Sequence, residues 1–491
     1  MRMDLENPEL EAFEPILQHL DRLVFEGGIE ALQKVGALGN SQELLSVIKT
    51  DPSLNRRFLR GCHYGWNEAQ GKIGKLVIQY EDEIRQLRPR LKEERRKHNE
   101  TEVKRLASVI SCLGSRQIVL RRLVDAILYH QIKMQNWILR RVSLEYRIRD
   151  IDPDTLARTL SIAGDLNRDE RMDFHLASDL TTCVHIGDLV KVTLSSKPAG
   201  WSLIELKEGR MNLILGDLIE KAGGNLEDDH IQKIREQYGN KAVSQAKRMM
   251  RQEARHRELT HVIEKDEGID PMYQIPIKLM PEAVTVRDYG DVLRRICAKA
   301  STTGIESAIV DKSFRLIALN RETFNLLGRP GIAHILYHLQ SGETHCTLNE
   351  NSADELGKMK SVFPFFDLVT MNLYAMWPPS VFLWPMPRDL VRDLLLGRVF
   401  VFGQLDYERV FELARTSGIE MRWAEDRELG FPQIAKLIPG SPNARGVSAR
   451  LMGSEKLAQT LFSGFFARIF LEFMSPSQFM ELVKAGFALT D

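Results

Sequence analysis

The chain has 491 residues, of which 43% are hydrophobic and 27% are charged. This composition excludes a fibrous or disordered chain, and the length exceeds what one core usually holds, so we expect two or three domains. Lys and Arg number 67 and Asp and Glu also number 67. The net charge of zero therefore gives no sign of a polyanionic partner, and local charge has to be considered instead.

The N-terminal part is expected to be helical. From residue 7 to about residue 150, apolar residues recur at helical spacing and few Gly or Pro interrupt them. The first 15 residues are acidic and lack the basic start and apolar run of a signal peptide. The five cysteines are odd in number and scattered, which fits a reducing compartment. We therefore expect a cytoplasmic protein.

Residues 85–149 form a basic segment within this helical part. They hold 17 Lys and Arg against 6 acids, a net charge of +11. Two interpretations stay open: a solvated helical face or coiled-coil flank, and a surface that contacts nucleic acid. Tyr129 and Trp137 within the segment are expected in the core rather than stacked on bases.

Two strands are expected in the central part. Residues 182–194 are rich in Val, Ile and Thr, and residues 201–207 form a second short run; the connection between them holds Pro198 and Gly200, as in a hairpin loop. Helical spacing returns at residues 211–221 and again in a long polar helix at about 227–264.

The last part is expected to be an α/β domain. Strands are predicted at residues 277–280, 307–310, 315–319 and 398–402. Residues 406–417 are expected to form the helix of a strand-helix-strand unit that ends at 421–423. The apolar stretch 457–474 contains Arg468 and Glu472, which argues against a bilayer span and favours a buried helix.

The two central strands carry the side chains with chemical potential. Asp188 would share one strand face with Val190 and Val192, and burying an unpaired acid in an apolar row costs several kcal/mol. Glu205 and Lys207 are two residues apart and would share a face of the second strand. If the strands pair, two carboxylates could hold Mg²⁺, and the lysine could orient water and neutralise charge on a phosphate.

This pattern resembles the PD-(D/E)XK nuclease superfamily, over roughly residues 145–264. Gly187-Asp188-Leu189 and Glu205-Leu206-Lys207 match the contexts of its two core strands, although the nominal Pro before the Asp is absent. The resemblance implies Asp188, Glu205 and Lys207 as catalytic residues, with Asp188 and Glu205 binding Mg²⁺ or Mn²⁺. It also implies an acid from an upstream helix, for which Glu145 is the candidate and Glu170 the rival.

Some members of that family carry a Gln and basic residues on a helix after the second strand. The corresponding nucleic-acid-binding candidates in this chain are Gln245, Lys247, Arg248, Arg251 and Arg255. Lys247, Arg251 and Arg255 recur at every fourth position, which would stack three cations on one helix face.

The expected architecture is a multidomain α+β and α/β protein. It comprises a basic helical region (1–144), a restriction-endonuclease-like α/β core with a mixed sheet (145–267) and a C-terminal α/β domain of unknown role (268–491).

The first hypothesis for function is a Mg²⁺- or Mn²⁺-dependent nuclease that hydrolyses nucleic acid, DNA rather than RNA by family analogy, with bacterial genome defence as its setting. The alternatives are a nucleic-acid-binding or scaffold protein whose nuclease-like fold does not cut, and a small-molecule sensor in the C-terminal domain. A structural hairpin with a salt bridge would explain the motif without any chemistry. Homo-oligomerisation and a further protein partner stay open.

Overall fold

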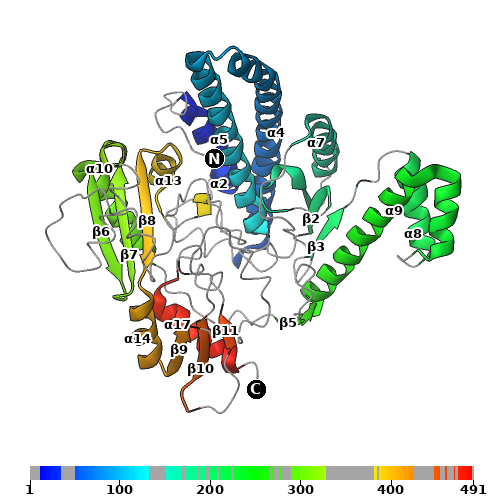
Figure 1. Cartoon of the computed structure of the whole chain (residues 1–491). Coiled ribbons are helices and arrows are strands. Elements are labelled where there is room, and N and C mark those ends of the chain that lie inside the picture. The colour runs from blue at the N-terminus through cyan, green and yellow to red at the C-terminus, as the bar shows by residue number, and fades with distance from the viewer. Residues whose placement is uncertain are drawn as a thin grey trace. The chain divides into compact units, whose positions relative to one another are not determined.

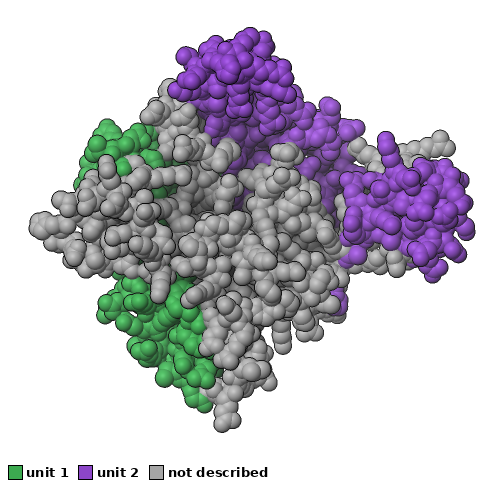
Figure 2. All heavy atoms as spheres, viewed as in Figure 1, with its two compact units in different colours: residues 1–14, 280–491 green, residues 15–279 purple. Residues whose placement is uncertain are grey.

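The fold is taken from a computed structural model of the whole chain. It describes residues 12–34, 50–131, 151–168, 173–184, 187–193, 200–204, 206, 210–222, 226–265, 267–269, 276–278, 289–327, 381–383, 386–423, 447–453, 459–461, 469 and 474–488. The chain divides into two compact units (Figure 2): unit 1 is Met1–Glu14 with Met280–Asp491, and unit 2 is Pro15–Leu279. The three-domain division made from the sequence stays a prediction.

Unit 2 contains the long helices α4 (Pro52–Arg96) and α5 (Glu100–Gln131), and α2 (Glu14–Gln33) from Pro15 onward. Helices α4 and α5 pack against each other (Figure 1), as their apolar spacing predicts. Glycines let α2 approach α4 at backbone distance: a Cβ atom on Gly65 would lie 2.2 Å from the carbonyl oxygen of Leu23. The predicted helical N-terminal part is thus confirmed over the described residues 12–34 and 50–131. Tyr129 is in its core, whereas Trp137 lies outside the described residues.

A three-stranded sheet follows helix α7 (Pro153–Asn167). Its strands are β1 (Asp173–Ala177), β2 (Leu189–Thr193) and β3 (Gly200–Ile204), in the antiparallel order β1-β2-β3. Leu189 pairs with Ile204 and Thr193 with Gly200, so β2 and β3 form the predicted hairpin.

The open edge of β1 is covered by two amide side chains. Gln70 of α4 accepts the N–H of Ala177 at 2.8 Å and donates to the carbonyl oxygen of His175 at 3.2 Å. Asn167 of α7 accepts the N–H of His175 at 2.7 Å and donates to the same carbonyl oxygen at 2.9 Å. These contacts satisfy backbone groups that an edge strand would otherwise leave unpaired.

Helices α8 (Arg210–Lys221) and α9 (Asp228–Lys265) form a hairpin with its own apolar core. Leu215 and Ile219 of α8 pack with Ile231, Ile234 and neighbouring residues of α9. Gly239, at φ 79°, interrupts the helical backbone within α9. The short strands β4 (Glu267–Ile269) and β5 (Pro276–Lys278) pair antiparallel after it.

Unit 1 contains two further antiparallel sheets. The first has the order β6-β7-β8 and is built from Ile305–Val310, Phe314–Asn320 and Val399–Leu405, with α10 (Gly290–Thr303) packed on β6 and β7. The second has the order β11-β10-β9 and is built from Gln459–Leu461, Val447–Leu451 and Ile419–Trp423. The remaining elements are η2 (Val381–Leu383), α13 (Arg388–Leu395), α14 (Tyr407–Thr416) and α17 (Pro476–Ala488).

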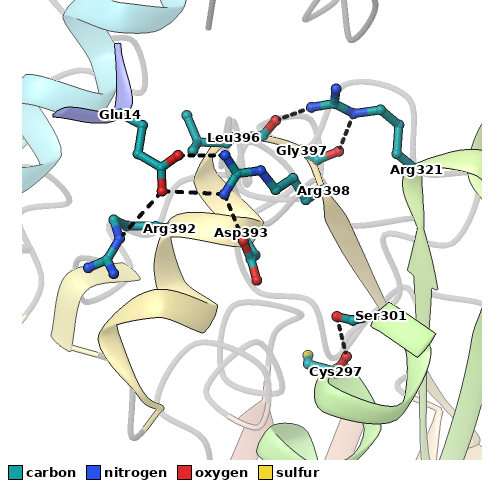
Figure 3. Close-up of polar contacts among 9 residues, drawn as sticks. All are labelled: Glu14, Cys297, Ser301, Arg321, Arg392, Asp393, Leu396, Gly397 and Arg398. Atoms are coloured by element: carbon teal, nitrogen blue, oxygen red, sulfur yellow. Dashed lines mark hydrogen bonds and ion pairs between the residues drawn. The ribbon is translucent and has the colours of Figure 1, made fainter. Parts of the chain in front are cut away.

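Glu14, which belongs to unit 1, takes part in a cluster of ion pairs (Figure 3). The Glu14 carboxylate contacts the Arg398 guanidinium at 2.6 Å (Oε2 to Nη2) and 3.3 Å (Oε1 to Nη1), and Asp393 Oδ1 lies 3.0 Å from Arg398 Nη1. The hydrogen bonding of the Arg398 guanidinium to the Glu14 carboxylate is the main cause that raises the pKa of Arg398. The Arg321 guanidinium donates hydrogen bonds to the carbonyl oxygens of Leu396 and Gly397. These bonds cap the C-terminal end of α13.

The predicted fold class holds in the coarse sense of mixed α and β, but its finer form does not. Every strand pair among the described residues is antiparallel, so the mixed central sheet and the parallel strand-helix-strand unit are not found there. Strands β8 and β9, on either side of α14, join different sheets. An apolar pattern reveals a strand but not its partner, and this is why the sequence misled.

Two local predictions also need correction. The strand expected at 182–194 begins only at Leu189, and the buried helix expected at 457–474 contains strand β11. Among the described helices, none is long and apolar enough to cross a bilayer.

Candidate functional site

Asp188 lies at the entry to β2 and links three segments of unit 2. Its backbone N–H donates to the carbonyl oxygen of Ile204 at 2.8 Å, and its own carbonyl oxygen accepts the N–H of Ser178 at 2.9 Å. Its carboxylate Oδ2 accepts the N–H of Leu206 at 2.6 Å. Gly187, at φ 73°, provides the turn that leads into the strand. The half-buried carboxylate is thus held against the end of β3.

The other members of the predicted catalytic set lie outside the described residues: Glu205, Lys207, Glu145 and its rival Glu170. Ile204 and Leu206 are the two chain neighbours of Glu205, and each of them hydrogen-bonds to Asp188. The convergence of Asp188, Glu205 and Lys207 on one pocket stays a prediction. Val190 and Val192, the apolar residues expected beside Asp188, both lie in β2 and are buried.

A buried polar cluster that the sequence analysis did not single out fixes the chain ahead of Asp188. Asp125 of α5 is fully buried, and its carboxylate accepts the N–H of Thr182 at 2.8 Å and the hydroxyl of Thr182 at 2.5 Å. Arg122 approaches the same carboxylate at 3.4 Å. Arg121 donates to the carbonyl oxygen of Thr181 at 2.6 Å. An acid inside the apolar run Leu123-Val124-Asp125-Ala126-Ile127 was the available signal.

This cluster also bears on the basic segment 85–149. Burial lowers the pKa of Arg121 to about 10, while the charges of Asp125 and Asp179 oppose that shift. Arg121 and Arg122 are both buried. These two cations therefore lie in the interior of unit 2, and neither interpretation left open for the segment applies to them.

The predicted nucleic-acid-binding residues lie on the second half of α9. Lys247, Arg248 and Arg251 are exposed, and within the described part of the chain none of the three takes part in an ion pair. Gln245 is half-buried, and the side chain of Arg255 lies outside the described residues. The helix that directly follows β3 is α8, which packs against α9. The cations are thus on the second helix after the strand, not the first.

A second buried group lies where α4 meets β1. The His63 ring contacts the rings of Trp66 and Phe174, with centroids 5.5 and 5.4 Å apart. Trp66 Nε1 donates to the carbonyl oxygen of Val24 at 2.9 Å. Burial lowers the pKa of His63 to about 4, and the nearby charge of Asp173 only partly opposes this. His63 is therefore neutral at physiological pH.

Within the described residues, no group of three or more His, Cys, Asp or Glu side chains is placed to hold a metal ion. Of the two predicted metal ligands, Asp188 and Glu205, only Asp188 belongs to the described residues. Comparison with known proteins adds no candidate, because no family model, curated protein or solved structure matches the chain.

Proposed function

We propose that this protein is a metal-dependent nuclease that hydrolyses phosphodiester bonds of nucleic acid, with DNA as the expected substrate. Support comes chiefly from one observation: Asp188 hydrogen-bonds to Ile204 on one side of Glu205 and to Leu206 on the other. Consecutive Cα atoms are about 3.8 Å apart, so these contacts favour two acids sharing one end of the β2-β3 hairpin.

The donor set suits a hard divalent cation. Asp188 and Glu205 would supply carboxylate oxygens, which are the ligands that Mg²⁺ and Mn²⁺ accept while keeping several waters. Such an ion, when bound, polarises a phosphoryl oxygen and lowers the pKa of bound water. Lys207 would orient the attacking water and neutralise the charge that develops on the phosphate. Glu145 or Glu170 would complete the acidic set.

Substrate would be held by the exposed cations of α9. Lys247, Arg248 and Arg251 have no competing carboxylate partner among the described residues, so they are available to phosphates. In this proposal Arg255 belongs to the same helix face as Lys247 and Arg251, and Gln245 is a further candidate contact. Alanine at Lys247 or at Arg251 is expected to weaken DNA binding for all sequences and to lower the salt slope of binding by about 1 each.

One observation favours the second candidate, a nucleic-acid-binding protein that does not cut. The Asp188 carboxylate has a structural role that needs no metal, because its short bond to Leu206 ties the end of β3 to the start of β2. The decisive variant is therefore Asp188→Asn, whose amide oxygen can still accept the Leu206 N–H while the negative charge is lost.

The test uses plasmid and linear DNA with Mg²⁺, with Mn²⁺ and with chelator, and measures Mn²⁺ binding by titration calorimetry. We expect metal-dependent cleavage that falls at least about 100-fold in Asp188→Asn and in Lys207→Ala. Only Asp188→Asn should also lose Mn²⁺ binding.

The matched controls for these variants come from the exposed Asp217–Lys221 ion pair of α8, as Asp217→Asn and Lys221→Ala, and both should cleave normally. Binding without cleavage under every condition would establish the non-catalytic alternative.

A further inference from the structure

Strand β6 is an edge strand whose outer side pairs with no strand among the described residues. The carbonyl oxygen of Gly304 accepts the N–H of Asn320, so Gly304 faces β7. Backbone groups alternate in direction along an antiparallel strand. The N–H and C=O groups of Ile305, Ser307 and Ile309 therefore point away from β7, to the open edge. The Thr303 hydroxyl donates to the Ile305 carbonyl oxygen at 3.0 Å, which agrees with this direction.

One face of β6 carries two exposed isoleucines. Ile305 is 38% exposed and Ile309 is 57% exposed, and both lie on the same face of β6 as Ser307 because the three alternate along the strand. None of these outward positions carries a charge or a proline, which are the usual protections of an edge strand. The edge of β1, in contrast, is covered by Gln70 and Asn167.

The edge of β6 is also self-complementary. Ile305 and Ile309 are placed symmetrically about Ser307, and the same three residues present the outward-pointing backbone groups, of which the Ile305 carbonyl oxygen also accepts the Thr303 hydroxyl. When two copies of β6 pair antiparallel about a two-fold axis at Ser307, each outward-facing residue must lie opposite an outward-facing residue of the second copy. This requirement is met, because Ile305 would meet Ile309 of the second copy and Ser307 would meet Ser307 of the second copy.

We propose that β6 is a homodimerisation edge, paired antiparallel with β6 of a second copy of this chain about a two-fold axis at Ser307. The pairing joins two three-stranded sheets into one of six strands and covers each exposed isoleucine with the other isoleucine of the second copy. Glu306 lies on the opposite face, bound to Lys299 at 3.4 Å, and faces Ala308 of the second copy. Like charges are thus not brought together across the axis.

The interface is small. Six residues of strand edge bury less than the roughly 1,200–2,000 Å² of a stable protein interface. The dimer is therefore expected to form at micromolar concentration and to dissociate on dilution, with the backbone bonds setting its register.

Sedimentation velocity over a concentration series tests the proposal. The wild type should shift from monomer to dimer, whereas Ile309→Lys and Ser307→Pro should stay monomeric. Proline is compatible with the monomer because the Ser307 N–H points outward. Met452→Lys is the matched control, since Met452 is 55% exposed and lies outside β6; it should dimerise like the wild type. A wild type that stays monomeric, or an Ile309→Lys variant that dimerises equally, overturns the proposal.

Cysteine cross-linking tests the register. Ile305→Cys and Ile309→Cys, mixed and oxidised, would bring Cα atoms about 5.5 Å apart, within disulfide range. Either variant alone would place its new cysteines about four residues apart, roughly 13 Å, so it should not cross-link. These single variants also control for the native cysteines. A mixture that gives no cross-link, or single variants that cross-link as well as the mixture, contradicts the pairing.

Discussion

Replacing Gln70 with leucine tests how the chain protects the open edge of β1. Gln70 is 1% exposed, and its amide makes one bond to the Ala177 N–H and one to the His175 carbonyl oxygen. Leucine has nearly the same volume, so the change removes both bonds and leaves little cavity.

The expected loss of stability depends on which hydrogen bonds the two backbone groups keep in the Gln70→Leu variant. The His175 carbonyl oxygen still accepts from Asn167 at 2.9 Å, whereas the buried Ala177 N–H loses its partner. An unsatisfied buried donor costs about 1–3 kcal/mol. Burying leucine in place of an amide recovers about 1 kcal/mol at most. We therefore expect Gln70→Leu to lower the free energy of unfolding by about 1–2 kcal/mol.

Urea unfolding and amide hydrogen exchange measure this effect. The control is Gln79→Leu on the same helix, because Gln79 is exposed and bonds only to the Glu83 carboxylate; it should change the free energy of unfolding by less than about 0.5 kcal/mol. Exchange protection of the Ala177 amide should fall in Gln70→Leu alone. Equal stability of the two variants, with Ala177 protection unchanged, would refute the assignment of Gln70 as the cover of this edge.

Three further predictions concern unit 2. As pH falls from 6.5 to about 4, the unfolded state takes up the His63 proton before the folded state does, so the free energy of unfolding should fall by about 3 kcal/mol. Urea titrations at both pH values should show a smaller fall in His63→Phe. Asp125→Ala leaves buried arginines without their carboxylate, so urea unfolding should show a free energy of unfolding lower by about 3–5 kcal/mol. The control Asp165→Ala, at an exposed ion pair, should lower it by less than about 0.5 kcal/mol. Gly65→Ala should lower the melting temperature because its Cβ would meet a backbone oxygen, whereas Gly71→Ala has open space and should gain about 0.5–1 kcal/mol.

Periodicity located the elements of this fold well but not their partners. The predicted helix at 211–221 is α8 at Arg210–Lys221, and the predicted helix at 406–417 is α14 at Tyr407–Thr416. Both patterns record burial along one face, which is a local property. Which strand pairs with β8 or with β9 depends on contacts remote in sequence, and no local pattern encodes them.

At the candidate site, too, the sequence indicated individual residues but not their partners. The sequence identified Asp188 as an acid that needs a partner, and the structure gives it a backbone partner in Leu206. Gln70 and Asp125 could not be assigned roles from the sequence, because their partners are 107 and 57 residues away. A buried polar side chain on an apolar helix face signals that a partner exists, but it does not identify the partner.

The segment that carries Asp188 is fixed from both sides, and this joins the helical region to the proposed chemistry. Asp125 of α5 holds Thr182 by two hydrogen bonds, Ser178 bonds to the Asp188 carbonyl oxygen, and Leu206 bonds to its carboxylate. Asp125 is buried and holds this segment at Thr182 and Cys183 without reaching the proposed metal site itself, so it is a positioning residue. In a purified, folded Asp125→Asn variant, which keeps one acceptor oxygen, Mn²⁺ affinity and cleavage should weaken together and by less than in Asp188→Asn. Loss of cleavage with wild-type Mn²⁺ affinity would instead place Asp125 outside the path that orients Asp188.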